Sequence, residues 1–281
     1  MLLQRIFNSP SWKVNKCLSP GVYLSTSSSF KEQKIIVGNY EINYLRVGRG
    51  PHHVFCAGAS MTTIWHSFEK QIKGFDHDKF SLVVWDPPGY GQSVALVNNK
   101  SFNIFSIDAD VAYEFMKAIQ IPKYSLMGWS RGGTACLILA RRHPEVVNKV
   151  VAWGACSFLL PKDVEYYTSM RNLDNWPKQL KDEMIKLYGK EKFITKVNEL
   201  ADTMIGCSKH VVSVCNDIRG ITCPTLLLHG AKDPVVDSSH LKHLHSLIAN
   251  SRIYLYPDGK HNIHIQYADD FNKRVQEFLL T

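Results

Sequence analysis

The chain of 281 residues is 45% apolar and 21% charged, a globular composition that can fill one large α/β core or two smaller ones. No apolar run reaches the ~18 residues that a membrane span needs, so we expect no membrane-spanning segment. Half of the net charge of +8 lies in the first 31 residues, and the other half is spread along the chain without a basic block. We therefore expect no nucleic-acid partner.

The N-terminal 31 residues contain four basic residues, seven serines and no acid, which is the composition of a mitochondrial transit peptide. A secretory signal is disfavoured because no continuous apolar stretch is present, and an ordinary disordered tail is the alternative. We expect a leader over residues 1–33, a folded domain over 34–281 and a mitochondrial location, with a cytoplasmic location as the alternative.

Strand patterns come first in the folded part. The runs 35–38 and 40–48 predict a hairpin, and residues 53–58 and 80–86 predict buried strands with a short helix, 65–72, between them. A helix follows, because its apolar residues recur at helical spacing: Ile104, Ile107, Val111, Phe115 and Ala118.

Strands and helices then alternate. Residues 124–127 predict a strand, and a helix follows from Thr134 until Pro144 stops it. Strands are expected over 147–154, 224–230 and 252–257, with helices over 238–248 and from Ala268 onward. Residues 156–221 interrupt this order with helices, including 177–188 and 191–205. The pattern predicts an α/β fold, a mostly parallel sheet flanked by helices with one helical insertion.

The turn after the strand at 124–127 carries a G-x-S-x-G motif, Gly128 to Gly132 with Ser130 at its centre. Such a turn strains the serine backbone, and glycines at its flanks let strand and helix approach closely. It would hold the serine hydroxyl out at the sheet edge. The motif alone is weak, since a glycine-rich strand–helix turn without chemistry matches it equally well.

Two later residues supply what a serine nucleophile needs, a base and a group that orients the base. Asp233 follows the strand at 224–230, and His261 follows the strand at 252–257. Each alone reads as a turn or surface residue. Together with Ser130 they follow the order Ser–Asp–His that accompanies this motif, at one sheet edge. The oxyanion donors are expected to be the backbone N–H groups of Arg131 and Ala59.

At these residues the chain resembles the α/β-hydrolases over about residues 35–281, and within them the biphenyl hydrolase-like proteins, the valacyclovir hydrolase group. The matching stretches are WDPPGYGQS at 85–93, GWS at 128–130, WGA at 153–155, HGAKDPVV at 229–236, GKHNIH at 259–264 and ADDFNK at 268–273. The resemblance implies a mitochondrial serine hydrolase of α-amino-acid esters, with Ser130 as nucleophile, His261 as base and Asp233 as its orienter. It also makes the insertion, 156–221, a lid.

Arg131 departs from the family, which has an aspartate there that pairs with the substrate's ammonium group. A cation in the first turn of a helix opposes the helix dipole by ~0.3–1 kcal/mol, so we expect an anionic group beside it. Arg131 could form a structural salt bridge, or it could face a pocket for a neutral or carboxylate-bearing acyl group and exclude cationic aminoacyl esters. In the second case Arg131→Asp should raise aminoacyl esterase activity. A smaller departure is Ala57, where the family usually has histidine or proline.

Aromatic residues open the insertion. Phe158, Tyr166 and Trp176 are candidate substrate contacts, and the alternative is that they only hold the lid on the core. His240, His243 and His245 could suggest a metal, but a helix would point His245 away from His240, so we interpret the cluster as a solvated surface. The seven cysteines form no C-x-x-C pair, which favours reduced thiols inside a cell.

The sequence therefore predicts a serine hydrolase that cleaves a small carboxylic ester, thioester or lactone through an acyl-enzyme at Ser130. This chemistry requires no metal and no organic cofactor, and we expect a monomer acting on a small molecule. Alternatives are a carbon–carbon hydrolase or perhydrolase with the same triad, or a non-catalytic ligand receptor. Epoxide hydrolase and haloalkane dehalogenase chemistry is disfavoured, since those enzymes attack with a carboxylate.

Overall fold

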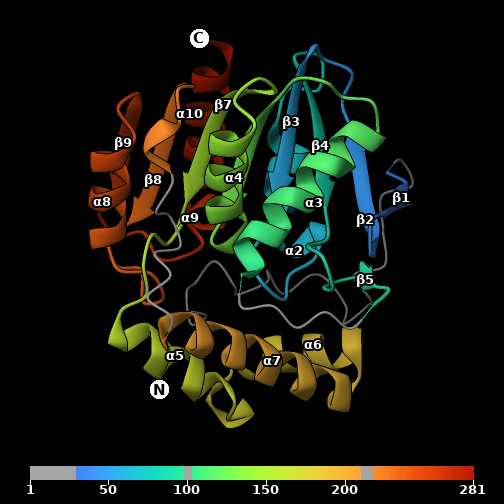
Figure 1. Ribbon diagram of the computed structural model, residues 1–281, viewed down its shortest axis with the longest axis vertical. Helices are drawn as coiled ribbons and strands as arrows, with labels where there is room; N and C mark the ends of the chain where they lie inside the picture. Colours follow the sequence, from blue (N-terminus) through green and yellow to red (C-terminus); the bar gives the residue numbers. More distant parts are fainter. Residues whose placement is uncertain (1–29, 98–102, 210–217) are drawn as a thin grey trace.

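A twisted, mostly parallel sheet forms the centre of the computed structural model, which describes residues 30–97, 103–209 and 218–281 (Figure 1). Residues 1–29, and with them most of the expected leader, lie outside the described residues. The first strand begins at Glu32, slightly before the expected domain start at residue 34. No helix of the described part combines the length and apolar character that crossing a membrane requires.

The strands pair in the order β1-β2-β4-β3-β6-β7-β8-β9, and β5 pairs with β2. β1, β2, β4 and β5 form the antiparallel part, whereas all pairs from β4 to β9 are parallel. The bounds are β1 (Glu32–Val37), β2 (Tyr40–Val47), β3 (His52–Ala57), β4 (Phe80–Trp85), β5 (Val94–Ala95), β6 (Tyr124–Trp129), β7 (Val147–Trp153), β8 (Thr225–Gly230) and β9 (Ser251–Tyr256).

Helices cover both faces of the sheet, as the alternation predicts. α3 (Ile104–Ala118), α4 (Arg131–Arg142) and α8 (Ser239–Leu247) pack on one face, and α2 (Ile64–Gly74) and α10 (Ala268–Leu280) on the other (Figure 1). The two faces have separate apolar cores, so a central strand such as β6 is buried along its whole length. The expected α/β class is confirmed.

The insertion between β7 and β8 forms a helical layer at the carboxyl ends of the strands (Figure 1). It comprises α5 (Pro161–Met170), η2 (Leu173–Asn175), α6 (Lys178–Tyr188), α7 (Lys190–Lys209) and η3 (Ile218–Gly220). Trp176 and Phe193 meet edge to face, with ring centroids 5.2 Å apart, and help join η2 to α7. The loops after β3, β6, β7, β8 and β9 thus open toward this layer. α9 (Ile263–Gln266) lies in the loop after β9.

Candidate active site

Ser130 occupies a strained turn between β6 and α4. Its φ of 56° and ψ of −119° lie outside the regions that ordinary residues prefer. The surrounding backbone leaves no space for side chains, because a Cβ on Gly128 would lie 2.5 Å from the carbonyl oxygen of Gly132. A Cβ on Gly133 would lie 2.9 Å from the oxygen of Gly128. The glycines are therefore needed for the close approach that the sequence motif predicts.

The loop after β3 packs directly against this turn. A Cβ on Gly132 would lie 2.1 Å from the carbonyl oxygen of Ala57, so backbone meets backbone here. Ala59, two residues further on, is buried and lines the same cavity as Ser130. Arg131 is the first residue of α4 and also lines it. Both residues expected to supply the oxyanion donors thus line the cavity that contains Ser130.

His261 and Asp233 are joined by a hydrogen bond of 2.8 Å between Nδ1 and Oδ2. The other carboxylate oxygen of Asp233 accepts the backbone N–H groups of Val235 and Val236, at 2.8 and 3.0 Å. Burial alone would raise the pKa of Asp233, but His261, His229 and a backbone N–H hold it below its ordinary value. An ionised carboxylate only accepts, so Nδ1 is the donor, and in the neutral form of the ring the lone pair is on Nε2 of His261.

The residues around His261 fix its position. Trp129 donates its indole N–H to the His261 carbonyl oxygen at 2.9 Å. Gly154, at the end of β7, has a φ of 56°, and a Cβ there would lie 2.9 Å from Cε1 of His261. A Cβ on Gly230 would likewise meet the backbone of Gly259 at 2.4 Å. Glycine at these positions lets the loops after β7, β8 and β9 converge, a role that the sequence analysis missed.

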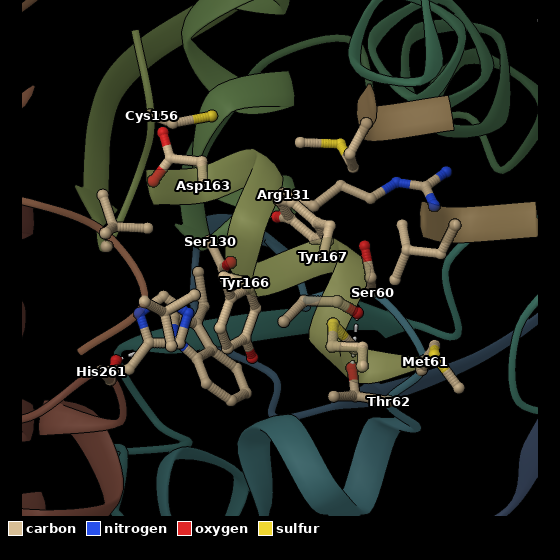
Figure 2. Close-up of a pocket in the computed structure, with 18 of the residues that line it drawn as sticks. Ser60, Met61, Thr62, Ser130, Arg131, Cys156, Asp163, Tyr166, Tyr167 and His261 are labelled. Atoms are coloured by element: carbon tan, nitrogen blue, oxygen red, sulfur yellow. Dashed lines mark hydrogen bonds between the residues drawn. The ribbon is translucent and has the colours of Figure 1, made fainter. Parts of the chain in front are cut away.

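Ser130 and His261 line a single cavity of about 150 Å³ between the sheet edge and the helical insertion (Figure 2). By the volume that one water needs, this is room for about ten water-sized positions, enough for a small organic molecule. The side formed by the insertion is largely apolar and aromatic, with Tyr166, Tyr167, Met170, Trp176, Leu180, Met184, Leu200 and Met204. Two of the expected contacts, Tyr166 and Trp176, are among them.

Phe158 does not line the cavity, unlike the expectation. Its ring packs against the imidazoles of His240 and His243, with centroids 4.3 and 5.2 Å away. Helical spacing alone does not show which aromatic residues of the insertion face the cavity. Cys156 and Asp163 line the cavity instead (Figure 2), and sequence reasoning named neither.

Asp163 accepts the backbone N–H of Leu160 at 2.7 Å, and burial raises its pKa. Burial also raises the pKa of the Cys156 thiol to about 12. This thiol is therefore protonated near neutral pH and is a poor nucleophile.

Arg131 forms a buried two-point ion pair with Asp108 on α3. Its Nε and Nη2 donate to the two carboxylate oxygens at 2.6 and 2.7 Å, and the side chains are 7% and 3% exposed. Burial opposes the guanidinium charge, but Asp108 outweighs it and raises the pKa of Arg131. Tyr90 lies against the guanidinium, 5.2 Å from ring centroid to Cζ. The expected anionic partner of Arg131 is therefore present, and the structural salt bridge is the geometry observed.

The histidine cluster on α8 is not a solvated surface, contrary to the expectation. His240 is 0% exposed and lines the cavity, and only His245 is exposed. α8 packs this face against Ser157 and Phe158, which lie after β7 and far away in the sequence. Within the described ranges no group of three or more His, Cys, Asp or Glu side chains is arranged to hold a metal ion.

The chain is similar to known hydrolases over most of its length. Residues 52–187 match the family model described as the alpha/beta hydrolase fold. Serine hydrolase BPHL of Homo sapiens is 32% identical over 272 residues, 93% of each chain. A 2-hydroxy-6-oxononadienedioate/2-hydroxy-6-oxononatrienedioate hydrolase of Escherichia coli K12 is 24% identical over 77% of this chain and 82% of its own. The structure of a 2-hydroxy-6-oxo-6-phenylhexa-2,4-dienoate hydrolase from Rhodococcus matches 90% of this chain and 99% of its own, with a TM-score of 0.77 and 16% identity.

Proposed function

The chain belongs to the α/β-hydrolase family, and from this premise we propose that it is a serine hydrolase with Ser130 as nucleophile, His261 as base and Asp233 as its orienting group. The observation that carries the proposal is geometric. A strained serine shares one cavity with a histidine whose Nδ1 is held by a buried carboxylate. This is the arrangement that activates a serine hydroxyl.

The reaction would proceed through an acyl-enzyme. Nε2 of His261 accepts the hydroxyl proton as Ser130 attacks the substrate carbonyl, and the backbone N–H groups of Ala59 and Arg131 stabilise the developing oxyanion. His261 then returns the proton to the leaving alcohol or thiol as the tetrahedral intermediate collapses. A water molecule, deprotonated by the same nitrogen, releases the acid and restores Ser130. Asp233 stays ionised and stabilises the imidazolium that forms in both halves.

The substrates we propose are small carboxylic esters, thioesters or lactones with a neutral acyl group. The acidic residue that the family uses beside the nucleophile is replaced here by Arg131, whose charge Asp108 neutralises. The wall next to Ser130 therefore carries no net charge to attract an ammonium group or a carboxylate. Amino-acid esters stay within the wider class because Asp163 also lines the cavity.

A carbon–carbon hydrolase using the same triad is the second candidate. It is favoured by the similarity to the Escherichia coli hydrolase of a 2-hydroxy-6-oxo dienedioate over 77% of the chain. Such dienoates absorb visible light, so loss of their colour on incubation with the protein would be a direct assay. Turnover of a dienoate in preference to every simple ester would favour this reaction.

A fluorophosphonate probe tests the proposal and separates it from a non-catalytic ligand receptor. Wild-type protein should be labelled at Ser130, as located by peptide mass spectrometry. Ser130→Ala should not be labelled, whereas Ser60→Ala, another serine in the cavity wall, should be labelled normally. Folded wild-type protein that resists the probe and turns over no ester would favour the receptor.

We also propose a mitochondrial location, supported by the acid-free N-terminus, and a monomer. Fusion of residues 1–33 to a fluorescent protein tests the location, since the fusion should enter mitochondria. A diffuse cytoplasmic signal would contradict it. Light scattering of the purified protein would give its oligomeric state.

A further inference from the structure

His240 is a polar residue in the cavity wall that the proposed triad does not use. It lies in the first turn of α8, on the same connection from β8 that carries Asp233. Its side chain is fully buried, with 0% exposure, although it lines the cavity. His240 lies near the site because the connection that follows β8 runs along the sheet edge where the cavity is.

The hydrogen bonds of His240 define which ring nitrogen carries the proton. Nδ1 accepts the backbone N–H of Ser157 at 3.3 Å and lies 3.2 Å from the Ser157 hydroxyl. A backbone N–H can only donate, so Nδ1 must offer its lone pair, and the proton of the neutral ring sits on Nε2. Burial lowers the pKa of His240 to about 4, so the ring is neutral at physiological pH. His240 therefore presents an N–H donor through Nε2.

Nε2 has no partner among the described residues, although it is buried. Buried N–H groups are nearly always paired, because leaving one unpaired costs much of the hydrogen-bond energy it had in water. The ring of Phe158 covers one side of the imidazole, with centroids 4.3 Å apart. His240 is one of the residues that line the cavity, so a molecule bound in the cavity is the candidate acceptor.

We propose that Nε2–H of His240 donates a hydrogen bond to an uncharged oxygen in the unreactive part of the substrate, such as a keto, ether or hydroxyl oxygen. This specificity rests on the proposed hydrolase function. An uncharged oxygen fits better than a carboxylate because the acid Asp163 lines the same cavity. The selected substrates are thus oxygenated esters rather than purely hydrocarbon ones.

Three variants isolate the donor. In His240→Asn the amide oxygen can replace Nδ1 as acceptor for Ser157, but nothing reaches the Nε2 position. In His240→Gln the longer amide can place an N–H near that position. His240→Leu removes both nitrogens and serves if the asparagine variant does not fold. His243→Asn is the matched control, because His243 lies 3.0 Å from the same Ser157 hydroxyl but does not line the cavity.

The experiment compares kcat/KM within pairs of esters, made both as 4-nitrophenyl esters and as alkyl esters. One ester of each pair carries a ketone, and the other carries a methyl-bearing carbon in place of the ketone carbon. The ketone is moved along the acyl chain and then along the alcohol chain. In at least one pair the wild type should prefer the ketone by about tenfold or more. His240→Asn and His240→Leu should bring that ratio close to one, while His240→Gln and His243→Asn should retain most of it.

A ratio that persists without the His240 donor, a wild type that prefers no ketone, or an equal loss on both esters of a pair would overturn the proposal. The methyl-bearing esters distinguish a failure of the His240 proposal from a failure of the proposed hydrolase function. Ser130-dependent turnover of these esters supports the hydrolase whatever the ratio is. Absence of turnover on every ester, with no fluorophosphonate labelling, would instead reject the hydrolase on which the assignment to His240 depends.

Discussion

Arg131 and Asp108 form a two-point ion pair inside the protein, with both side chains less than a tenth exposed and N–O distances of 2.6 and 2.7 Å. Arg131 directly follows Ser130, so this pair replaces the single negative charge that the family has beside its nucleophile. Figure 2 shows the guanidinium directed away from His261. The ion pair with Asp108 explains how a cation is held at this helix start.

The first prediction concerns this pair. Arg131→Asp alone should not create an aminoacyl esterase, because it would bury two carboxylates side by side. Removing the partner of a buried charge costs about 3–5 kcal/mol, and thermal or urea unfolding should show a loss of this size. Asp108→Asn with Arg131→Asp leaves one carboxylate beside an amide donor. In this double variant the ratio of kcat/KM for a cationic aminoacyl ester to that for a neutral ester should rise about tenfold or more.

The control makes the same charge change at a second pair between α3 and α4. Arg142 and Asp110 lie 2.6 Å apart but are 37% and 62% exposed at the surface. Asp110→Asn with Arg142→Asp should leave the ratio of the two esters unchanged and cost little stability. If the Asp108/Arg131 double variant folds and its ratio stays at the wild-type value, the ion pair does not set the charge preference.

A second prediction follows from the contact between Gly154 and His261. Gly154→Ala places a methyl group 2.9 Å from Cε1 of a ring that is held by Asp233 and so cannot move without loss of its alignment. We expect kcat/KM to fall about 100-fold, the size of effect that a small misplacement of a catalytic group produces.

Gly38→Ala is the matched variant. Gly38 has a φ of 54°, similar to the 56° of Gly154, but no atom lies within 4 Å of the added methyl group. Backbone strain should cost each variant about 1 kcal/mol of stability, and the contact with His261 should add to this cost in Gly154→Ala alone. Only Gly154→Ala should lose activity, and equal activity in the two variants would show that the position of His261 does not depend on this contact.

A third prediction concerns stability in acid. His264 accepts the Trp153 indole N–H through Nδ1 at 2.9 Å and donates through Nε2 to the Ser67 carbonyl oxygen at 2.8 Å. Burial lowers its pKa to about 3, so the folded state stays neutral while an unfolded histidine takes up a proton below pH ~6.5. The contribution of neutral His264 to the free energy of unfolding is therefore complete above pH ~6.5 and is lost progressively as the pH falls toward 3.

The free energy of unfolding should therefore decrease between pH 6.5 and 4, and His264 should account for about 1.4 kcal/mol per pH unit of that slope. Denaturant unfolding at several pH values measures it. His264→Gln should have a shallower slope, whereas His245→Gln, at an exposed position, should keep the wild-type slope. A wild-type slope in His264→Gln would rule out this histidine as a source of acid sensitivity.

Local patterns predict the fold and the three proposed catalytic residues because each depends on the chain near it. The strand–turn–helix around Ser130, and the positions of Asp233 and His261 after strands, follow from the spacing of apolar residues and from the glycine and proline residues that end each element. Asp108 was missed, although it lies on the apolar face of its helix, where an acid needs a partner. That partner is on another helix, and spacing within one helix cannot name it.

The same limit explains the errors at Phe158 and at the histidines of α8. The burial of His240 and the packing of Phe158 against it arise where α8 meets the segment after β7, and these two segments are more than 80 residues apart in sequence. Gly154 reads as an ordinary strand end until His261 is placed against it. These contacts depend on tertiary packing, and patterns within short stretches of one sequence do not show which distant segments pack together.

The most direct test of the account is kcat/KM for three esters with one leaving group and a cationic aminoacyl, a neutral acyl or an anionic acyl part, measured on wild type and on Ser130→Ala. We predict Ser130-dependent turnover with the neutral ester preferred over both charged esters, because Arg131 and Asp108 cancel beside the nucleophile. A clear preference for the aminoacyl ester would contradict this and assign ammonium binding to another acid in the cavity, such as Asp163.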